Sequence, residues 1–400
     1  MTNVLLLTAG TGGGHIAVAD ALADALRDCL GDERGIMSAA PLGQAVDSGY
    51  GWMLTRAPRL WGACYAATDC VPGMAVGRRV LGVRYGRRFA SLVAQLRPAV
   101  IISVHALCTQ VAAAHMRARR DRLTLHCVVT DLIDVHRSWV APEVSTYFVA
   151  TQAAAAALEG LGVPPTRIQV VGLPLRRPFW TPCGGLHAAT SQASPRDCAF
   201  ESRHRRRLRV LAMDGGVPGP QLTNVLRILA HAGVPLDITA ARGSRAPLAR
   251  SYEIAGRDSS RICTLGRGES IAQAMRDADL VVTKAGSLTI AEALAVGRPI
   301  LLHRAAPGQE KSNPAFVERV GAGLSVSTRE SLIDTIRFLA DSPETRALMG
   351  LRAQAYGRPG AALDTAARVV DMTGAGRPAN HSVLRASSLR THIESASSVF

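Results

Sequence analysis

The sequence predicts an α/β protein made of two doubly wound halves, and two observations carry this prediction. Buried-strand runs at residues 3–8 and 209–213 each end in a glycine-rich turn, which is how a doubly wound unit begins. After each of them, short apolar runs of strand length alternate with helical stretches. The 400 residues suffice for two to three domains.

Composition narrows the class of protein. A hydrophobic fraction of 48% with 19% charged residues is typical of a soluble globular protein. The net charge of +15 favours phosphorylated substrates, anionic lipid surfaces or nucleic acid as partners. Aromatic residues make up only 4% and no nucleic-acid-binding signature occurs, so we expect no nucleic acid partner.

Cysteine usage and hydropathy indicate the compartment. The eight cysteines show no CxxC pair and no metal-ligand spacing, which is typical of reduced cytosolic thiols. The N-terminus resembles no signal peptide, and no apolar run reaches the length of a transmembrane helix. We therefore expect a cytoplasmic protein whose membrane contact, if present, is peripheral.

The first half opens with a strand, a glycine turn that ends at His15, and a helix over Ile16–Leu30. Three consecutive glycines favour a backbone that lies close to a ligand, with a simple tight turn as the alternative. The turn is not GxGxxG, which argues against a nicotinamide cofactor. Asp131 follows a later strand run, where doubly wound sheets keep their crevice, although a capping role is the alternative. The further strand runs are predicted at residues 100–104, 125–130, 146–150 and 168–171.

Residues 50–97 differ in character, because aromatic and basic side chains are interleaved there. This mixture suits the headgroup region of an anionic membrane. The alternative is an ordinary solvated helix face with a few core aromatics. The candidate membrane and acceptor residues are Trp52, Arg56, Arg59, Trp61, Arg78 and Arg79.

The second half contains the most informative stretch, residues 279–313. A strand over Leu280–Thr283 turns at Gly286 into a helix over Leu288–Ala295, so free backbone N–H groups and a positive dipole end meet at one point. That arrangement predicts an anion site, usually for a diphosphate. Glu292 lies about one turn into the helix, within reach of a ribose diol.

The same region holds two further patterns. The chain's only two lysines, Lys284 and Lys311, lie there; a coding bias toward arginine is as good an explanation as a phosphate-binding role. Asp277-Ala278-Asp279 spells DxD, which we interpret as a cap and turn rather than a metal site. Strands are also predicted at 236–240, 262–265 and 300–302, and helices at 330–339 and 344–372.

These motifs together resemble a known family. TKAGSLTIAEALAVGRPIL followed by PGQEKSN, with TGGGH at 11–15, VTD at 129–131 and GLPLRRPF at 172–179, resembles the monogalactosyldiacylglycerol synthases and the processive diacylglycerol glucosyltransferases. These are GT-B enzymes related to the peptidoglycan lipid-intermediate N-acetylglucosaminyltransferase. The resemblance covers about residues 3–370. It implies two Rossmann-like doubly wound domains that face an interdomain cleft.

The resemblance implies a domain order. Residues 1–175 would form the acceptor- and membrane-facing domain and residues 208–372 the domain that binds a UDP-sugar. Residues 176–207 would be a linker or insertion, and 373–400 a disordered tail. The enzyme would lie on the inner face of the cell membrane.

The resemblance also implies roles for single residues. His15 resembles the general base, and Asp131 is a second candidate for that role or for orienting it. Glu292 would hold the ribose hydroxyls, and Gln309 and Glu310 would contact the sugar. The remaining donor-binding residues would be Gly13, Gly14, Gly215, Gly216, Arg242, Lys284, Gly286, Ser287, Leu288 and Lys311.

The implied activity is inverting transfer of a hexose from a UDP-sugar to a lipid hydroxyl, that of diacylglycerol, without a cofactor or a metal. Two alternatives stay open: transfer to a soluble natural-product acceptor, and a UDP-sugar epimerase or binding protein on the same fold. The turns MDGGVPGP and Ala241–Ser244 depart from the family pattern on the donor side, so the sugar is open as well.

Overall fold

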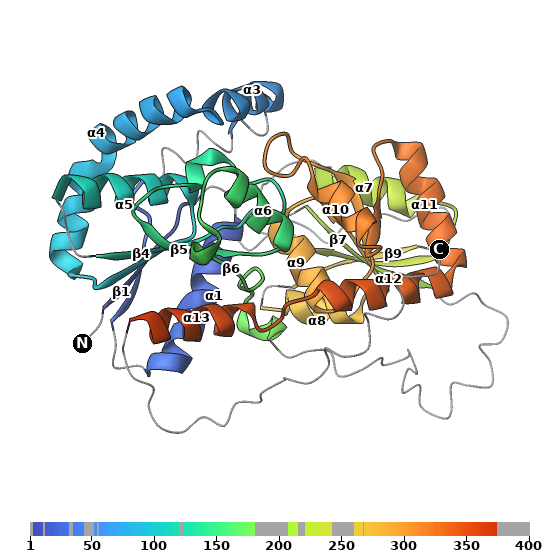
Figure 1. Cartoon of the computed structure of the whole chain (residues 1–400). Coiled ribbons are helices and arrows are strands. Elements are labelled where there is room, and N and C mark those ends of the chain that lie inside the picture. The colour runs from blue at the N-terminus through green and yellow to red at the C-terminus, as the bar shows by residue number, and fades with distance from the viewer. Residues whose placement is uncertain are drawn as a thin grey trace, which may run out of the picture.

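The computed structural model describes residues 3–10, 13–31, 35–43, 52–53, 56–119, 123–180, 207–214, 221–241, 260–266 and 268–373. They form two α/β halves, each built on a six-stranded sheet (Figure 1). Most of the expected linker or insertion and the expected tail lie outside the described residues.

The first sheet is entirely parallel, with strand order β2-β1-β3-β4-β5-β6. Parallel strands buried on both faces are near-continuous apolar runs in sequence, which is why most of them are predictable. The edge strand β2 is only partly buried, and no strand was predicted there. The strands are β1 (Val4–Leu7), β2 (Ile36–Ala39), β3 (Val100–Ser103), β4 (Thr124–Val128), β5 (Val144–Val149) and β6 (Ile168–Val170).

Alternate side chains of this sheet enter two separate cores. Leu5, Leu7 and Ile101 face α4, α5 and α6, whereas Val4 and Leu6 face α1 and α13. The long helices α3 and α4 cross the outside of this half (Figure 1). The helices are α1 (Gly13–Leu30), α3 (Pro58–Thr68), α4 (Val71–Leu96), α5 (Ala106–Arg119) and α6 (Gln152–Gly160), with short 3-10 turns at Arg137–Trp139, Pro165–Arg167 and Arg177–Phe179.

The second sheet repeats the plan with strand order β12-β11-β10-β7-β8-β9, again all parallel. Its helices are α7 (Gln221–Ala230), α8 (Ile271–Asp277), α9 (Ser287–Ala295), α10 (Asn313–Arg319), α11 (Arg329–Asp341) and α12 (Pro343–Tyr356). Its strands are β7 (Leu208–Met213), β8 (Leu236–Ala241), β9 (Arg261–Thr264), β10 (Leu280–Lys284), β11 (Ile300–Arg304) and β12 (Gly323–Ser325).

The last helix prediction was wrong in one respect. The sequence predicts one helix over Glu344–Met372, but the structure has α12 and then α13 (Ala361–Met372), separated by Gly357–Gly360. Pro359 lacks the N–H that a continuous helix needs, and the flanking glycines favour a break. The break lets α13 return to the first half, where it packs along α1 (Figure 1).

The strand orders locate the functional edge of each sheet. In each half the first strand has the strands that follow it directly on one side and a later strand on the other, so the crevice opens beside β1 and β3, and beside β7 and β10. The two edges come together at α1 and α9, because a Cβ added to Gly14 would lie 3.9 Å from the Cβ of Leu288.

Candidate active site

His15 occupies the crevice of the first sheet, in the first turn of α1. Its Nδ1 lies 2.8 Å from the Val104 carbonyl oxygen, just beyond β3, and 3.3 Å from the Thr130 hydroxyl. A carbonyl only accepts, so Nδ1 carries the proton and Nε2 keeps its lone pair. Burial lowers the pKa of His15 to about 4, against the smaller opposing effect of the Val104 hydrogen bond. His15 is therefore a neutral imidazole that can accept a proton at Nε2.

Asp131 belongs to the same cluster. Its carboxylate accepts a hydrogen bond of 2.7 Å from the Trp139 indole, and the Trp139 ring lies 6.5 Å from the His15 ring. Burial raises the pKa of Asp131 to about 7; the Trp139 hydrogen bond opposes this rise and the charge of Asp134 adds to it. The structure thus brings the two predicted catalytic residues to one place.

His105 completes this cluster and was not predicted. It comes just after Val104 at the end of β3, and its ring meets the His15 ring edge-on at 4.7 Å. Burial lowers the pKa of His105 well below its ordinary value, and the neighbouring His15 lowers it further. The available signal was its place at the end of a buried strand, the same signal that singled out Asp131.

The first turn of α9 faces this cluster from the other half. Gly286 is its N-cap and makes no side-chain cap, so the backbone N–H groups of Ser287 and Leu288 are not capped by it. Beneath them Asn313, which is 1% exposed, donates to the Ala285 carbonyl at 2.8 Å and fixes the turn. The predicted anion site therefore has the expected local geometry, opposite Gly14.

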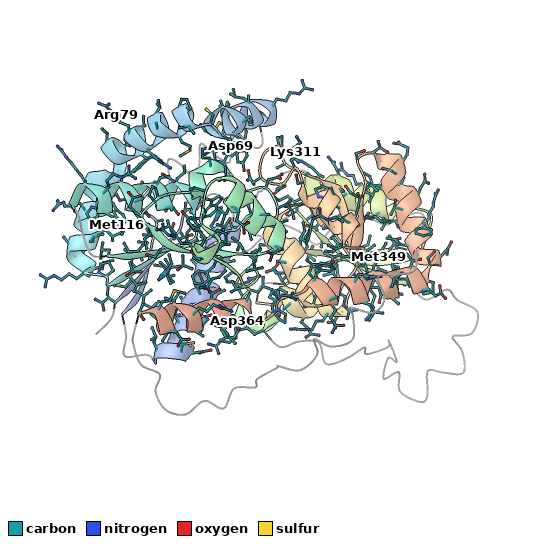
Figure 2. All side chains as sticks on the ribbon, viewed as in Figure 1. Asp69, Arg79, Met116, Lys311, Met349 and Asp364 are labelled. Atoms are coloured by element: carbon teal, nitrogen blue, oxygen red, sulfur yellow. The ribbon has the colours of Figure 1, made fainter. Side chains whose placement is uncertain are left out.

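The loop after β11 covers this turn. Glu310, 5% exposed, forms an ion pair with Lys284, and its second oxygen accepts from the Ala306 N–H at 2.9 Å. A Cβ on Gly286 would lie 3.3 Å from the Lys284 nitrogen. Gln309 is half-buried, whereas Lys311 is exposed in this loop (Figure 2). The two lysines are thus not equivalent, because only Lys284 lies beside the turn.

Glu292 lies on α9 and is 3% exposed. Arg176, from the segment after β6, donates to it at 3.1 Å. Burial raises the pKa of Glu292, and the charge of Arg176 opposes that rise. Arg176 was not predicted, because a contact across 116 positions leaves no local pattern in the sequence.

Comparison with known proteins shows which enzymes this chain resembles. Residues 15–175 match the monogalactosyldiacylglycerol (MGDG) synthase family model, and residues 235–360 match the glycosyltransferase family 28 C-terminal domain. Both models describe glycosyltransferase domains, so the chain is a glycosyltransferase. The enzyme is 26% identical over 353 residues to the processive diacylglycerol beta-glucosyltransferase of Bacillus licheniformis, covering 84% of this chain and 86% of that protein. It is 27% identical to the chloroplastic monogalactosyldiacylglycerol synthase of Spinacia oleracea, over 90% and 70% of the two chains.

Solved structures confirm the predicted fold of the enzyme. Acinetobacter baumannii MurG superposes with a TM-score of 0.57 at 14% identity, covering 93% of this chain and all of that one. S. aureus MnaA, solved with UDP, gives 0.58 at 13% identity, covering 95% of this chain and all of that one. At such identities the likeness concerns the fold alone.

The predicted membrane residues divide into two groups. Trp52, Arg56, Arg59 and Arg79 are exposed, and Arg79 lies on the outer side of α4 (Figure 2). Trp61 and Arg78 face inward, and Arg78 donates to Gln110 at 2.7 Å and to the Val140 carbonyl at 2.8 Å. The sequence reading missed the exposed apolar side chains of α3 and α4, among them Leu60, Val71, Val76, Val80 and Val83.

The DxD motif has structural partners. Asp277 accepts from Gln273 at 2.9 Å, and Asp279 binds the backbone and guanidinium of Arg209, at the beginning of the second sheet. Among the described residues no group of three His, Cys, Asp or Glu side chains is placed to hold a metal ion. Gly215, Gly216 and Arg242 lie outside those residues, so their donor-binding roles stay predictions.

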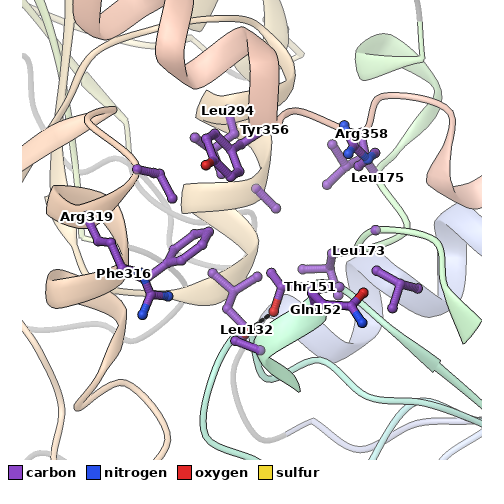
Figure 3. Close-up of a pocket in the computed structure, with 16 residues that line it drawn as sticks. Leu132, Thr151, Gln152, Leu173, Leu175, Leu294, Phe316, Arg319, Tyr356 and Arg358 are labelled. Carbon is purple, nitrogen blue, oxygen red and sulfur yellow. Dashed lines mark hydrogen bonds between the residues drawn. The ribbon is translucent and has the colours of Figure 1, made fainter. Parts of the chain in front are cut away.

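A cavity of about 420 Å³ separates the two halves along the outer part of α9 (Figure 3). Leu173 and Thr151 of the first half face Leu294 and Phe316 of the second. The Thr151 hydroxyl donates to the Leu132 carbonyl, so one wall of the cavity is attached to the residue after Asp131. The halves therefore approach closely at the first turn of α9 and leave a gap farther along it.

Proposed function

We propose that the enzyme transfers a hexose from a UDP-sugar to the hydroxyl group of diacylglycerol, with inversion at the anomeric carbon. The observation that carries this proposal is the neutral His15 imidazole, which lies opposite the N-terminus of α9, a place that suits a diphosphate. The names of the relatives support the transfer of a hexose to diacylglycerol.

In the proposed reaction, Nε2 of His15 takes the proton of the acceptor hydroxyl as its oxygen attacks the anomeric carbon. The bond from that carbon to the phosphate oxygen breaks, and UDP leaves toward Ser287 and Leu288. The N–H groups and dipole of α9 stabilise the charge that develops on the leaving diphosphate. A metal is not required for this charge stabilisation, and the absence of a metal requirement is part of the proposal.

The remaining donor contacts follow from the predicted roles. Glu292 would accept hydrogen bonds from the ribose hydroxyls, and the charge of Arg176 opposes the rise in the pKa of its carboxyl group. Gln309 and Glu310 would face the sugar, and Lys284 would hold Glu310 in place. Asp131 would orient Trp139 and the acceptor beside His15.

A donor and acceptor screen tests the proposal. UDP release is measured with UDP-glucose or UDP-galactose, with and without diacylglycerol in phosphatidylglycerol vesicles. We expect release that depends on diacylglycerol, and a loss of about 10²–10⁴-fold in His15→Ala. His231→Ala, an exposed histidine on the second half, is the matched control and should keep full turnover. Full turnover in His15→Ala would remove the assignment of the base, and release without any lipid would show that water, not diacylglycerol, takes the hexose.

We also propose that α3 and α4 dock on an anionic membrane surface. No described helix is long and apolar enough to cross a bilayer. The side chains of Val76, Val80 and Val83 recur on one stripe of α4, are 59–81% exposed, and lie among exposed arginines such as Arg79.

Vesicle sedimentation tests this docking. Val80→Glu should weaken binding to phosphatidylglycerol vesicles, because it places a negative charge in the apolar stripe against an anionic surface. Leu351→Glu, at an exposed leucine on α12, should have no effect. Equal sedimentation of both variants would place the membrane surface elsewhere.

A further inference from the structure

Helix α3 lies between the two loops that carry the predicted site residues. One is the donor loop, residues 305–312, which holds Gln309 and Glu310. The other is the catalytic loop, residues 130–139, which begins at Thr130 and ends at Trp139. The donor loop rises beside the end of α3 in Figure 1. The proposed function assigns no role to the contacts between α3 and these loops.

Helix α3 packs tightly against the donor loop. Gly308 has a φ of +90°, and a Cβ there would lie 3.1–3.3 Å from the Tyr65 ring. One turn earlier on α3, a Cβ on Gly62 would lie 3.2 Å from the Cβ of Pro307. At both glycines an added Cβ would push its neighbouring side chain aside, and the Tyr65 ring rests on the residue before Gln309.

The contact with the catalytic loop is equally specific. The Tyr65 ring lies 4.4 Å from the His136 ring, and His136 Nε2 donates to the Tyr65 carbonyl at 3.0 Å. Near the C-terminal end of α3, Asp69 accepts from the Arg137 N–H at 2.7 Å. Helix α3 is therefore held to one loop by hydrogen bonds and supports the other loop by packing.

The outer side of α3 is exposed. Leu60 is 53% exposed, and Arg59 beside it is exposed as well. A lipid surface that contacts this side restricts the position of α3, and so also restricts the Tyr65 ring on its inner side. A loop that packs on a fixed ring loses less conformational entropy when it closes on a ligand.

We propose that Tyr65 is a positioning residue for the donor loop, through which docking of α3 on a lipid surface strengthens donor binding. This proposal rests on the proposed function, because it takes the donor loop to bind the nucleotide-sugar. Linkage makes the effect reciprocal: the factor by which vesicles raise donor affinity equals the factor by which the donor raises vesicle affinity.

The experiment measures that factor twice on the full chain. The Kd values of UDP-glucose and UDP-galactose are determined by calorimetry with and without phosphatidylglycerol vesicles that contain no diacylglycerol. Vesicle binding is then determined by sedimentation with and without the tighter-binding UDP-sugar at saturation. We expect both affinities to rise by the same factor, about fivefold or more, which is the low end of typical coupling between sites.

Variants locate the coupling. Tyr65→Ala should reduce the factor to about one while the UDP-sugar and the vesicles still bind separately, and Tyr65→Phe should retain it because the ring remains. Gly308→Ala disturbs the same contact from the other side, so it decides the question if Tyr65→Ala does not fold. Cys64→Ala, at an exposed neighbour on α3, is the matched control.

A factor of one in the parent enzyme, or an unchanged factor in both Tyr65→Ala and Gly308→Ala, overturns the coupling while leaving the proposed function intact. Failure of the parent enzyme to bind either UDP-sugar overturns both proposals. Failure to bind the vesicles overturns the coupling together with the docking surface, and leaves the chemistry at His15 standing.

Discussion

Asp131→Asn tests whether the catalytic cluster is assembled at the expense of stability. Asparagine has nearly the shape of aspartate and can still accept the hydrogen bond from Trp139. It cannot ionise, so the variant removes only the charge that burial and Asp134 disfavour.

The expected size of the change in the free energy of unfolding follows from the pKa of Asp131. The folded protein holds the Asp131 proton up to about pH 7, whereas an unfolded chain releases it near 3.8. Between these pH values the folded state binds more protons, so the Asp131 contribution to the free energy of unfolding falls as pH rises and is constant above about pH 7. This fall corresponds to about 4 kcal/mol, at roughly 1.4 kcal/mol for each tenfold change in proton affinity.

Urea unfolding followed by circular dichroism, from pH 4.5 to 8.5, measures the effect. Buried histidines with lowered pKa values act in the opposite direction over part of this range, but they are present in both proteins and cancel in the difference. We expect Asp131→Asn to gain stability over the parent as pH rises toward 8. A stability difference that does not change with pH would refute the ionisation argument.

Three further predictions concern separate parts of the enzyme. Because the pKa of His15 is about 4, kcat/KM of Asp131→Asn should keep its value down to about pH 5, and an acid limb near 6.5 in a pH–rate profile would contradict the assignment. Glu292→Gln should raise the KM for the donor by about tenfold or more with a smaller change in kcat, because it replaces one of the two acceptor oxygens for the ribose hydroxyls with an amide donor; steady-state kinetics decides this. Gly172→Ala should lower the Tm by several degrees, because a Cβ there would lie 2.5 Å from the Cβ of Arg358. Gly162→Ala, with a similar φ of +89° and open space around it, should lower the Tm less. Equal Tm values in calorimetry would contradict the packing argument.

The fold was largely predictable from the sequence, because buried parallel strands leave continuous apolar runs. The predicted strand at residues 236–240 is β8, and the predicted run at 280–283 is β10. The short edge strand β12, of three residues, has too few side chains to form such a run. Helix α1 begins at Gly13, earlier than predicted, because the glycine turn itself continues into the helix.

The candidate site was predictable only for residues whose place follows from the neighbouring strand and turn. His15, Asp131 and Ser287 each follow a buried strand, and parallel strands end at a common edge. Arg176 contacts Glu292 across 116 positions of the sequence, and Tyr65 contacts His136 across 71. The inward direction of Arg78 depends on Gln110 of another helix, so basic residues at helical spacing did not reveal which of them face solvent.

Helix α13 has a consequence for how the enzyme is made. The core on the α1 side of the first sheet is completed by Ala362, Ala366 and Val369, which are translated long after β6. At 5–20 residues per second, the ribosome needs about 10–40 s to cover that distance. During this interval the nascent first half exposes apolar surface on α1, so we expect chaperones to bind it there and chains cut after β6 to aggregate.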